Sequence, residues 1–197
     1  MFKRLCIVSV VLLLAAIVVA AASAAVVRVR VEGKNATIFG QTEPRASGAN
    51  ALDVLESASV AGEFYYHVAD SSFGRYVDQI GRYGGTGSSG WVFKVNGVSP
   101  PVGADKVELK DGDTVLWYYA TFSDKGGPPT LKLTAARGGC YQAVAQDDAG
   151  KPVSTDGVFL QVDTRVVKTA TGRACPGPHR GLVRAVKFGY VRSNALK

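Results

Sequence analysis

The sequence is poor in the residues that most often carry catalysis or bind metals, because its 197 residues include two histidines and three cysteines. A Ser-His-Asp or Cys-His arrangement needs an imidazole held against a nucleophile. His67 lies in the strand-like run 65–68, whereas His179 follows Pro178 in a loop, so we expect the two histidines in different structural units. We therefore expect no catalytic residues, and a protein that is not an enzyme.

The usual cofactor and metal motifs are missing too. The segment Gly84–Gly90 is rich in glycine, but it has neither the Lys-Ser/Thr ending nor the following helix of a phosphate-binding loop, so we interpret it as a flexible loop. Asp111 with Asp113, and Asp147 with Asp148, lie in turn-like segments that do not match the EF-hand pattern. Turn formation explains these carboxylates, with weak calcium ligation as the alternative, and we predict no metal site and no cofactor.

The N-terminus has the features of a secretory signal, which we place at residues 1–25. Lys3 and Arg4 precede an uncharged stretch over 5–22, and the small residues Ala22-Ser23-Ala24 suit signal peptidase. An apolar run of this length can also span a bilayer, so an uncleaved membrane anchor is the alternative. With cleavage, we predict an extracellular or cell-envelope protein without a transmembrane span.

Two cysteines remain after removal of this signal, which contains Cys6. An oxidising compartment favours pairing of Cys140 with Cys175, and neither has the spacing of a metal ligand. Closing a loop of this size stabilises a small domain by roughly 3 to 4 kcal/mol in the chain-entropy picture. We predict a structural disulfide.

Charge is distributed unevenly along the chain. Residues 26–129 contain ten Lys or Arg against twelve Asp or Glu, whereas residues 130–197 contain eleven against four. A basic C-terminal half suits an anionic partner such as a cell-envelope polymer, and solubility is the alternative explanation. Nucleic acid is not expected, since Phe188 and Tyr190 are the only aromatic residues near the cations Arg165, Lys168, Arg173, Arg180, Arg184, Lys187 and Arg192.

Hydrophobic patterning divides the exported chain at a Gly/Pro-rich linker over 123–129, which leaves units at 26–122 and 130–197. In the first unit, Asn50 is positioned to cap a helix of about three turns that ends near Gly62. Strands are expected there at 26–31, 36–39, 64–68, 75–80, 91–95, 102–109 and 115–122, with a tight turn at Asn96-Gly97. This pattern predicts an α+β unit, with one helix on a mainly antiparallel sheet.

The second unit shows no helical pattern. Short strands separated by turns are expected at 131–134, 140–146, 158–162, 165–169 and 182–188. This spacing predicts a small all-β sandwich, which gains from a covalent crosslink because its core is small.

Residues 26–122 resemble the C-terminal domain of transcobalamin and intrinsic factor, a domain that also occurs in bacterial surface proteins of unknown function. The resemblance rests on 51–55 in the helix, on Gly90-Trp91-Val92-Phe93-Lys94-Val95-Asn96-Gly97, and on 109–119. It implies a β-grasp or ubiquitin-like arrangement and contact with a corrinoid such as cobalamin. The second unit resembles, more weakly, the immunoglobulin-like modules of bacterial secreted proteins, through 147–153, 169–172 and 183–185.

Aromatic side chains crowd the first unit and are the candidate ligand-binding residues. Alternation places Trp117 and Tyr119 on the face opposite Tyr118, so the set that points outward is expected to offer a stacking surface for a planar ligand or sugar. Core packing is the alternative for each of them. The candidates are Tyr65, Tyr66, Tyr83, Trp91, Trp117 and Tyr118. We expect a secreted binding or adhesion protein, with a carrier of a small planar ligand as the alternative.

Overall fold

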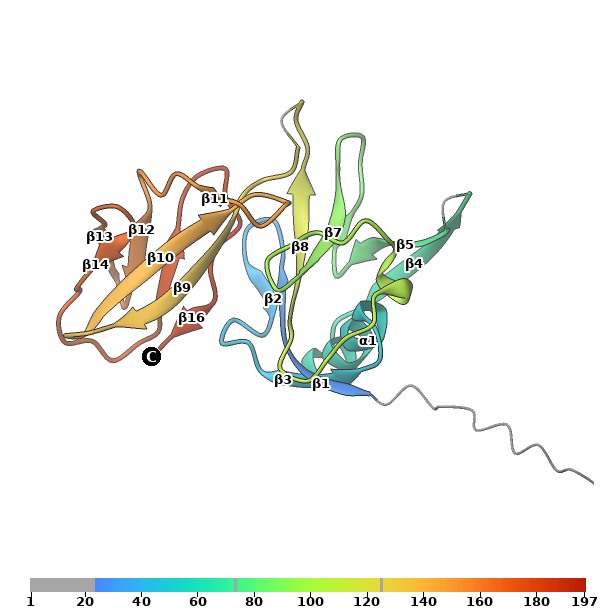
Figure 1. Ribbon diagram of the computed structural model, residues 1–197, viewed down its shortest axis with the longest axis horizontal. Coiled ribbons are helices and arrows are strands. Elements are labelled where there is room, and N and C mark those ends of the chain that lie inside the picture. The colour runs from blue at the N-terminus through green and yellow to red at the C-terminus, as the bar shows by residue number, and fades with distance from the viewer. Residues whose placement is uncertain (1–23, 73, 125) are drawn as a thin grey trace, which may run out of the picture.

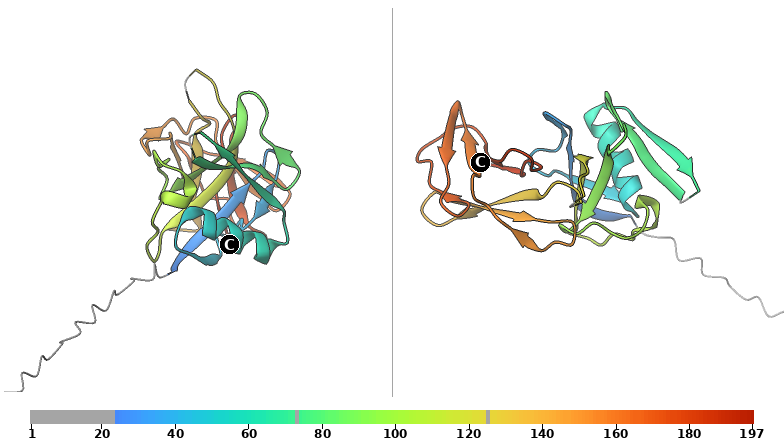
Figure 2. Two further views of the ribbon diagram at one scale, coloured as in Figure 1. Left: turned by 90° about the vertical axis from the view of Figure 1, so that its right-hand side faces the viewer. Right: turned by 90° about the horizontal axis from the view of Figure 1, so that it is seen from above.

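A computed structural model describes residues 24–72, 74–124 and 126–197. The predicted signal sequence lies, except for its last two residues, outside this description. Within the described ranges, no helix has the length and apolar character that crossing a membrane would require. The described chain is mostly β-structure with one α-helix and several sheets, which form two lobes side by side (Figures 1 and 2).

The single α-helix, α1, spans Ala51–Gly62 and begins where the sequence predicts. The Asn50 side chain accepts hydrogen bonds from the backbone N–H groups of Leu52 (3.0 Å) and Asp53 (2.9 Å), which satisfies two donors that the first turn leaves unpaired. The helix ends at Glu63, whose φ of 50° is left-handed. Its apolar face is buried against the main sheet of the N-terminal half, residues 25–121.

The main sheet has the order β2-β1-β8-β7, with β3 also paired to β1. Strands β1 and β8 run parallel, and the other pairs are antiparallel. A smaller sheet, β4-β5-β6, packs beside β7. The bounds are β1 Ala25–Glu32, β2 Thr37–Phe39, β3 Arg45–Gly48, β4 Tyr66–Ser71, β5 Gly74–Ile80, β6 Tyr83–Gly84, β7 Ser89–Val95 and β8 Thr114–Thr121.

One local prediction for this half is wrong, and another is confirmed only in part. The segment 102–109 is not a strand: it contains the 3₁₀ helix η1, Ala104–Lys106, and a single isolated bridge from Glu108 to Asn50. It follows two prolines, which cannot donate to a sheet. The buried side chain of Leu109 packs into the core without a strand around it. The loop predicted at Gly84–Gly90 is present but shorter, because β6 ends at Gly84 and β7 begins at Ser89. Within it, Thr86 and Ser89 exchange backbone hydrogen bonds of 2.9 and 2.8 Å.

The C-terminal half, residues 130–196, consists of two small sheets that enclose a second core. One contains β9 Thr130–Ala136, β10 Cys140–Gln146, β11 Pro152–Val153 and β14 Arg173–Ala174; the other contains β12 Phe159–Val162, β13 Arg165–Lys168, β15 Val183–Val186 and β16 Ala195–Leu196. Each of the five strands expected in this half overlaps an observed strand. The short strands β11, β14 and β16 were not expected.

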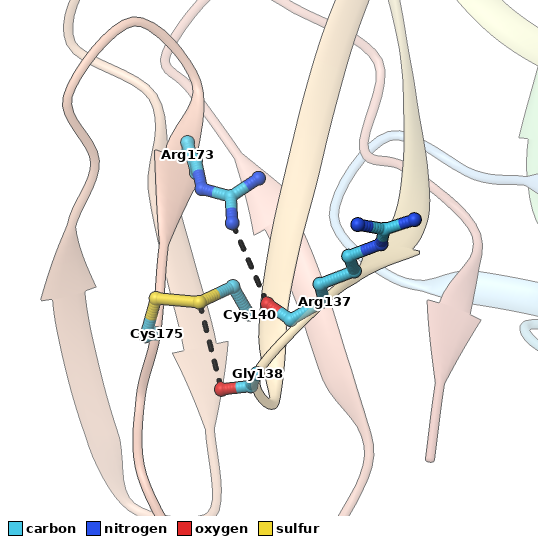
Figure 3. Close-up of a disulfide and its surroundings, with 5 residues drawn as sticks. All are labelled: Arg137, Gly138, Cys140, Arg173 and Cys175. Carbon is cyan, nitrogen blue, oxygen red and sulfur yellow. Dashed lines mark hydrogen bonds between the residues drawn. A yellow bond between two sulfur atoms is a disulfide. The ribbon is translucent and has the colours of Figure 1, made fainter.

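The predicted disulfide is confirmed. Cys140, at the start of β10, is joined to Cys175, which directly follows β14 (Figure 3). The bridge links segments 35 residues apart in sequence. Beside it, the Arg173 side chain donates a hydrogen bond to the Arg137 carbonyl (3.5 Å). The bridge therefore fastens β14 to the end of the β9–β10 hairpin.

The two halves share a small third cluster of buried residues. Leu116, Tyr118 and Ala120 on β8 pack with Val191 of the C-terminal half. These residues lie on the face of the main sheet opposite α1, because successive side chains of a strand alternate between faces. The C-terminal half therefore covers one side of the main sheet, and α1 covers the other.

Candidate functional site: an apolar cavity beside strand β7

Trp91 and Trp117 lie on the helix-facing side of the main sheet, and neither is a free stacking surface. Trp91 is 7% exposed and its indole N–H donates to the Tyr83 carbonyl (2.7 Å), while Trp117 is 2% exposed and donates to the Ala51 carbonyl (3.2 Å). The ring of Phe93 stacks on Trp117 with centroids 5.0 Å apart. Both indoles are thus anchored to backbone at their polar end and present only apolar ring surface to their surroundings.

Beside these rings lies a cavity of about 260 Å³. It is bordered by β5 and β7, and its lining is completed by the segment 99–104, by β8, and by Phe122 and Asp148. Its apolar lining includes Tyr76, Val77, Trp91, Phe93, Ala104 and Phe122. Concave apolar surface with a few polar groups is the usual form of a small-molecule site, so this cavity is the candidate functional site.

Residues at the outer edge of β7 line this cavity as well. The backbone N–H of Asn96 donates to the Thr114 carbonyl, and the backbone N–H of Phe122 donates to the Ser88 carbonyl. The even-numbered residues of β7 are therefore the ones whose backbone groups bond to β8. By alternation, the N–H and C=O groups of Trp91 and Phe93 point away from β8. No backbone partner for them occurs among the described residues. The cavity therefore offers hydrogen-bonding groups as well as apolar surface.

Tyr118 lies on the face of β8 opposite Trp117 and also lines the cavity. Its hydroxyl donates to Asp148 Oδ1 (3.2 Å), and Asp148 also accepts from the Gly127 backbone (3.1 Å). Burial, reinforced by the Asp148 charge, raises the pKa of Tyr118. This phenol therefore stays protonated at neutral pH and serves as a hydrogen-bond donor.

Lys94 is fully buried beside this group. Its Nζ donates to the Asp147 carbonyl (2.7 Å) and to Thr130 Oγ1 (3.2 Å), and it lies 3.5 Å from Asp148 Oδ1. Burial lowers the pKa of Lys94, and the nearby carboxylates oppose that effect. These contacts tie β7 to the C-terminal half, next to the cavity.

Of the six candidates, the structure brings Trp91, Trp117 and Tyr118 together at the cavity and places the other three elsewhere. Tyr65 is 59% exposed, and Tyr83 packs against Tyr119 with centroids 6.0 Å apart. The Tyr66 hydroxyl donates to Glu56 Oε2 (2.5 Å); burial, together with this carboxylate, raises the pKa of Tyr66 to about 12.

Sequence reasoning did not select Tyr76, Phe122 or Asp148, which also line the cavity. Tyr76 belongs to a different sheet from β7, and Asp148 belongs to the C-terminal half, so no local spacing connects them. A signal was available for Tyr76, because it follows Arg75 in the expected strand 75–80, where side chains on one face are expected to be exposed.

Part of the predicted basic surface is used inside the molecule. Glu32 is 1% exposed, and it pairs with Arg30 at 3.1 Å, with Arg192 at 2.9 Å and with Arg184. Arg184 and Arg192 belong to the C-terminal half, so they bind the N-terminal half rather than facing an external anion. Burial lowers the pKa of Arg184, and the Glu32 charge opposes this effect.

The two histidines lie apart, as expected. His67 Nδ1 is 2.7 Å from Asp78 Oδ1 on the exposed β4–β5 hairpin, and His179 Nε2 is 3.0 Å from the Tyr141 hydroxyl. Among the described residues, no group of three or more His, Cys, Asp or Glu side chains is arranged to hold a metal ion.

Comparison with known proteins gives one family match. A family model described as "Domain of unknown function (DUF4430)" matches residues 48–121, a stretch that contains α1, β7 and β8. A solved structure described as a "putative metal binding protein from Ruminococcus gnavus ATCC 29149" is similar at 13% identity, with 50% of this chain and 99% of that chain covered and a TM-score of 0.38. No curated protein matches the chain.

Proposed function

We propose that this protein is an exported, non-enzymatic binding protein that holds a small apolar ligand, or the apolar part of a larger one, in the cavity between β5 and β7. The observation that carries the proposal is the cavity itself, with Trp91, Phe93 and Tyr76 as ring surfaces. On the edge of β7, the backbone groups of Trp91 and Phe93 have no backbone partner among the described residues. The match of residues 48–121 to a domain of unknown function is compatible with a binding role.

A binding role accounts for the polar groups better than catalysis does. The Tyr118 phenol is held protonated, and Lys94 is fully enclosed by Thr130, Asp147 and Asp148. The exposed pair His67 and Asp78 lies on a hairpin and does not line the cavity. The groups at the cavity therefore serve to position a ligand and to hold the fold together.

Titration with apolar fragments tests the proposal. Single-ring and two-ring aromatic fragments are expected to change the fluorescence of the two tryptophans, since both line the cavity. Ala104→Leu fills the cavity from η1 and is expected to weaken fragment binding at least tenfold, a loss of about 1.4 kcal/mol. The control is Ala61→Leu, the same substitution at an exposed position on α1. Fragment binding that is unaffected by Ala104→Leu would contradict the proposal.

A corrinoid is the second candidate, carried by the resemblance of residues 26–122 to the transcobalamin C-terminal domain. The parallel pair β1 and β8 with α1 across them supports a β-grasp arrangement for this half, as that resemblance implies. The cavity of about 260 Å³ lies slightly below the usual range for sites that enclose a drug-sized ligand, so it favours a ligand smaller than a corrin ring. Equilibrium dialysis against cobalamin separates the two candidates, because retention of cobalamin would favour the carrier.

The C-terminal half supports a secreted protein of two modules. Its two facing sheets and its disulfide suit an immunoglobulin-like module in an oxidising compartment. We infer that this half holds the binding domain at the cell envelope. Localisation of the full-length chain by cell fractionation tests that assignment, and recovery in the cytoplasmic fraction would contradict it.

A further inference from the structure

A second hollow, of about 810 Å³, lies between the two halves on a different surface from the cavity beside β7. We call it the basic cleft and define it by Lys34 of the N-terminal half and by Phe159, Lys187, Phe188 and Arg192 of the C-terminal half. The described residues that line it include three cations and no carboxylate. An anion that enters the cleft therefore meets cations and no carboxylate among the described lining residues.

Two of the three cations are free to meet an external ligand. Arg192 is already engaged inside the molecule, because its guanidinium lies 2.9 Å from buried Glu32. Lys34 is exposed, and it has no hydrogen-bond or ion-pair partner among the described residues. Lys187 Nζ donates to the Ser154 carbonyl (3.3 Å) and keeps further N–H groups for other acceptors.

The position of Lys187 is fixed before any ligand binds. Its Nζ lies 4.0 Å from the centre of the Tyr190 ring, and the Tyr190 hydroxyl donates to the same Ser154 carbonyl at 3.1 Å. A cation that already rests on an aromatic face loses little conformational freedom when an anion arrives. The geometry thus provides one preorganised positive charge at the cleft.

Next to Lys187 stands the most exposed aromatic side chain of the described chain. Phe188 is 102% exposed, at the corner of a turn closed by a 3.2 Å bond from the Tyr190 N–H to the Lys187 carbonyl. Gly189 follows it with a φ of 76°, which the turn requires. Phe159, 37% exposed, lines the same cleft. Solvent-exposed aromatic rings beside cations indicate a surface that contacts a ligand or partner.

We infer that the basic cleft binds an anionic polysaccharide, with sugar rings against Phe188 and Phe159 and with acidic groups near Lys34 and Lys187. Aromatic faces suit the apolar faces of sugar rings, and the exposed amides of Asn35 and Gln161 suit hydroxyl groups. The choice of a polysaccharide over a nucleic acid rests on the exported location proposed above. The site itself is independent of the cavity beside β7, so either can fail alone.

Calorimetric titration with oligogalacturonate, in low salt and in 0.5 M salt, tests this inference on the full exported chain. Binding is expected at low salt and is expected to weaken strongly at high salt, since exposed charges are screened. Phe188→Ala is expected to weaken binding about tenfold, and Lys187→Ala about threefold. The matched control replaces Lys132 and Val144, an exposed cross-strand pair on β9 and β10, with alanine and is expected to leave binding unchanged.

Three further probes distinguish an acidic polysaccharide from a neutral sugar, from phosphate alone and from nucleic acid. A neutral malto-oligosaccharide is expected not to bind, and inorganic polyphosphate is expected to bind without sensitivity to Phe188→Ala. No binding of oligogalacturonate at low salt overturns the inference, as does equal loss of binding in the control variant. Tighter, Phe188-dependent binding of oligothymidylate would also overturn it and assign the cleft to single-stranded nucleic acid.

Discussion

Replacing Glu32 with glutamine tests whether the two halves are held together by a buried charge cluster. Glu32 is 1% exposed, Arg30 3%, Arg184 13% and Arg192 20%. Glu43 is the other carboxylate in contact, at 3.3 Å from Arg30. Glu32→Gln therefore leaves three clustered guanidinium groups with one carboxylate among the described partners.

The expected cost follows from the burial of these groups. An exposed ion pair contributes about 0 to 1 kcal/mol, whereas removing one partner of a buried pair costs about 3 to 5 kcal/mol because it leaves uncompensated charge. We expect Glu32→Gln to lower the free energy of unfolding by about 3 kcal/mol or more. The control is Asp105→Asn, which removes a carboxylate from a pair whose Lys106 partner is 73% exposed and is expected to cost less than about 1 kcal/mol.

Urea denaturation with two probes makes the test specific to the interface. Both tryptophans lie in the N-terminal half, so their fluorescence reports that half, and far-ultraviolet circular dichroism reports both halves. The two transitions are expected to coincide in the wild type and to separate in Glu32→Gln. Coincident transitions and a change in stability below about 0.5 kcal/mol in the variant would show that the Glu32 cluster does not hold the two halves together.

Three other predictions concern single contacts. Replacing both Cys140 and Cys175 with serine is expected to lower the free energy of unfolding by about 3 to 4 kcal/mol. Denaturation of the variant and of the oxidised wild type measures this difference, and a loss below about 1 kcal/mol would contradict a stabilising role of the disulfide. Asn50→Ala removes the α1 cap and is expected to cost about 1 kcal/mol in thermal unfolding; an unchanged Tm would be inconsistent with the capping bonds. Alkaline titration at 295 nm is expected to show Tyr66 ionising near pH 12, and Glu56→Gln is expected to lower that pKa. The neutral phenol contributes stability that is present below pH 10 and is lost as the pH rises through about 12. A titration midpoint that does not move in the variant would argue against the contact between Tyr66 and Glu56.

Local signals in the sequence predicted local structure well. The Asn50 cap, the valine alternation of β1 and the turn at Asn96-Gly97 each appear as expected, since each depends on residues close together in the chain. The disulfide was predictable because only two cysteines remained to pair. The segment 102–109 misled the prediction, because its apolar residues contact the core singly rather than along a strand.

The relation between the halves was not predictable in the same way. The sequence showed an excess of positive charge over 130–197, but it did not show that Arg184 and Arg192 meet Glu32 some 150 or more positions earlier. Likewise, Asp148 had the features of a turn residue, yet its carboxylate meets Tyr118 and the backbone of Gly127. Contacts of this kind depend on how two folded surfaces meet, which local spacing does not encode.

Nuclear magnetic resonance can show whether apolar ligands bind in the cavity beside β7. Two-ring aromatic fragments would be titrated into the ¹⁵N-labelled protein while the indole N–H signals of Trp91 and Trp117 and the backbone signals of Val77 and Phe93 are followed. If ligands bind there, saturable shifts are expected to be largest for Trp91 and Phe93, which line the cavity. Saturable shifts confined to residues outside the cavity, or none at millimolar fragment, would contradict binding in this cavity.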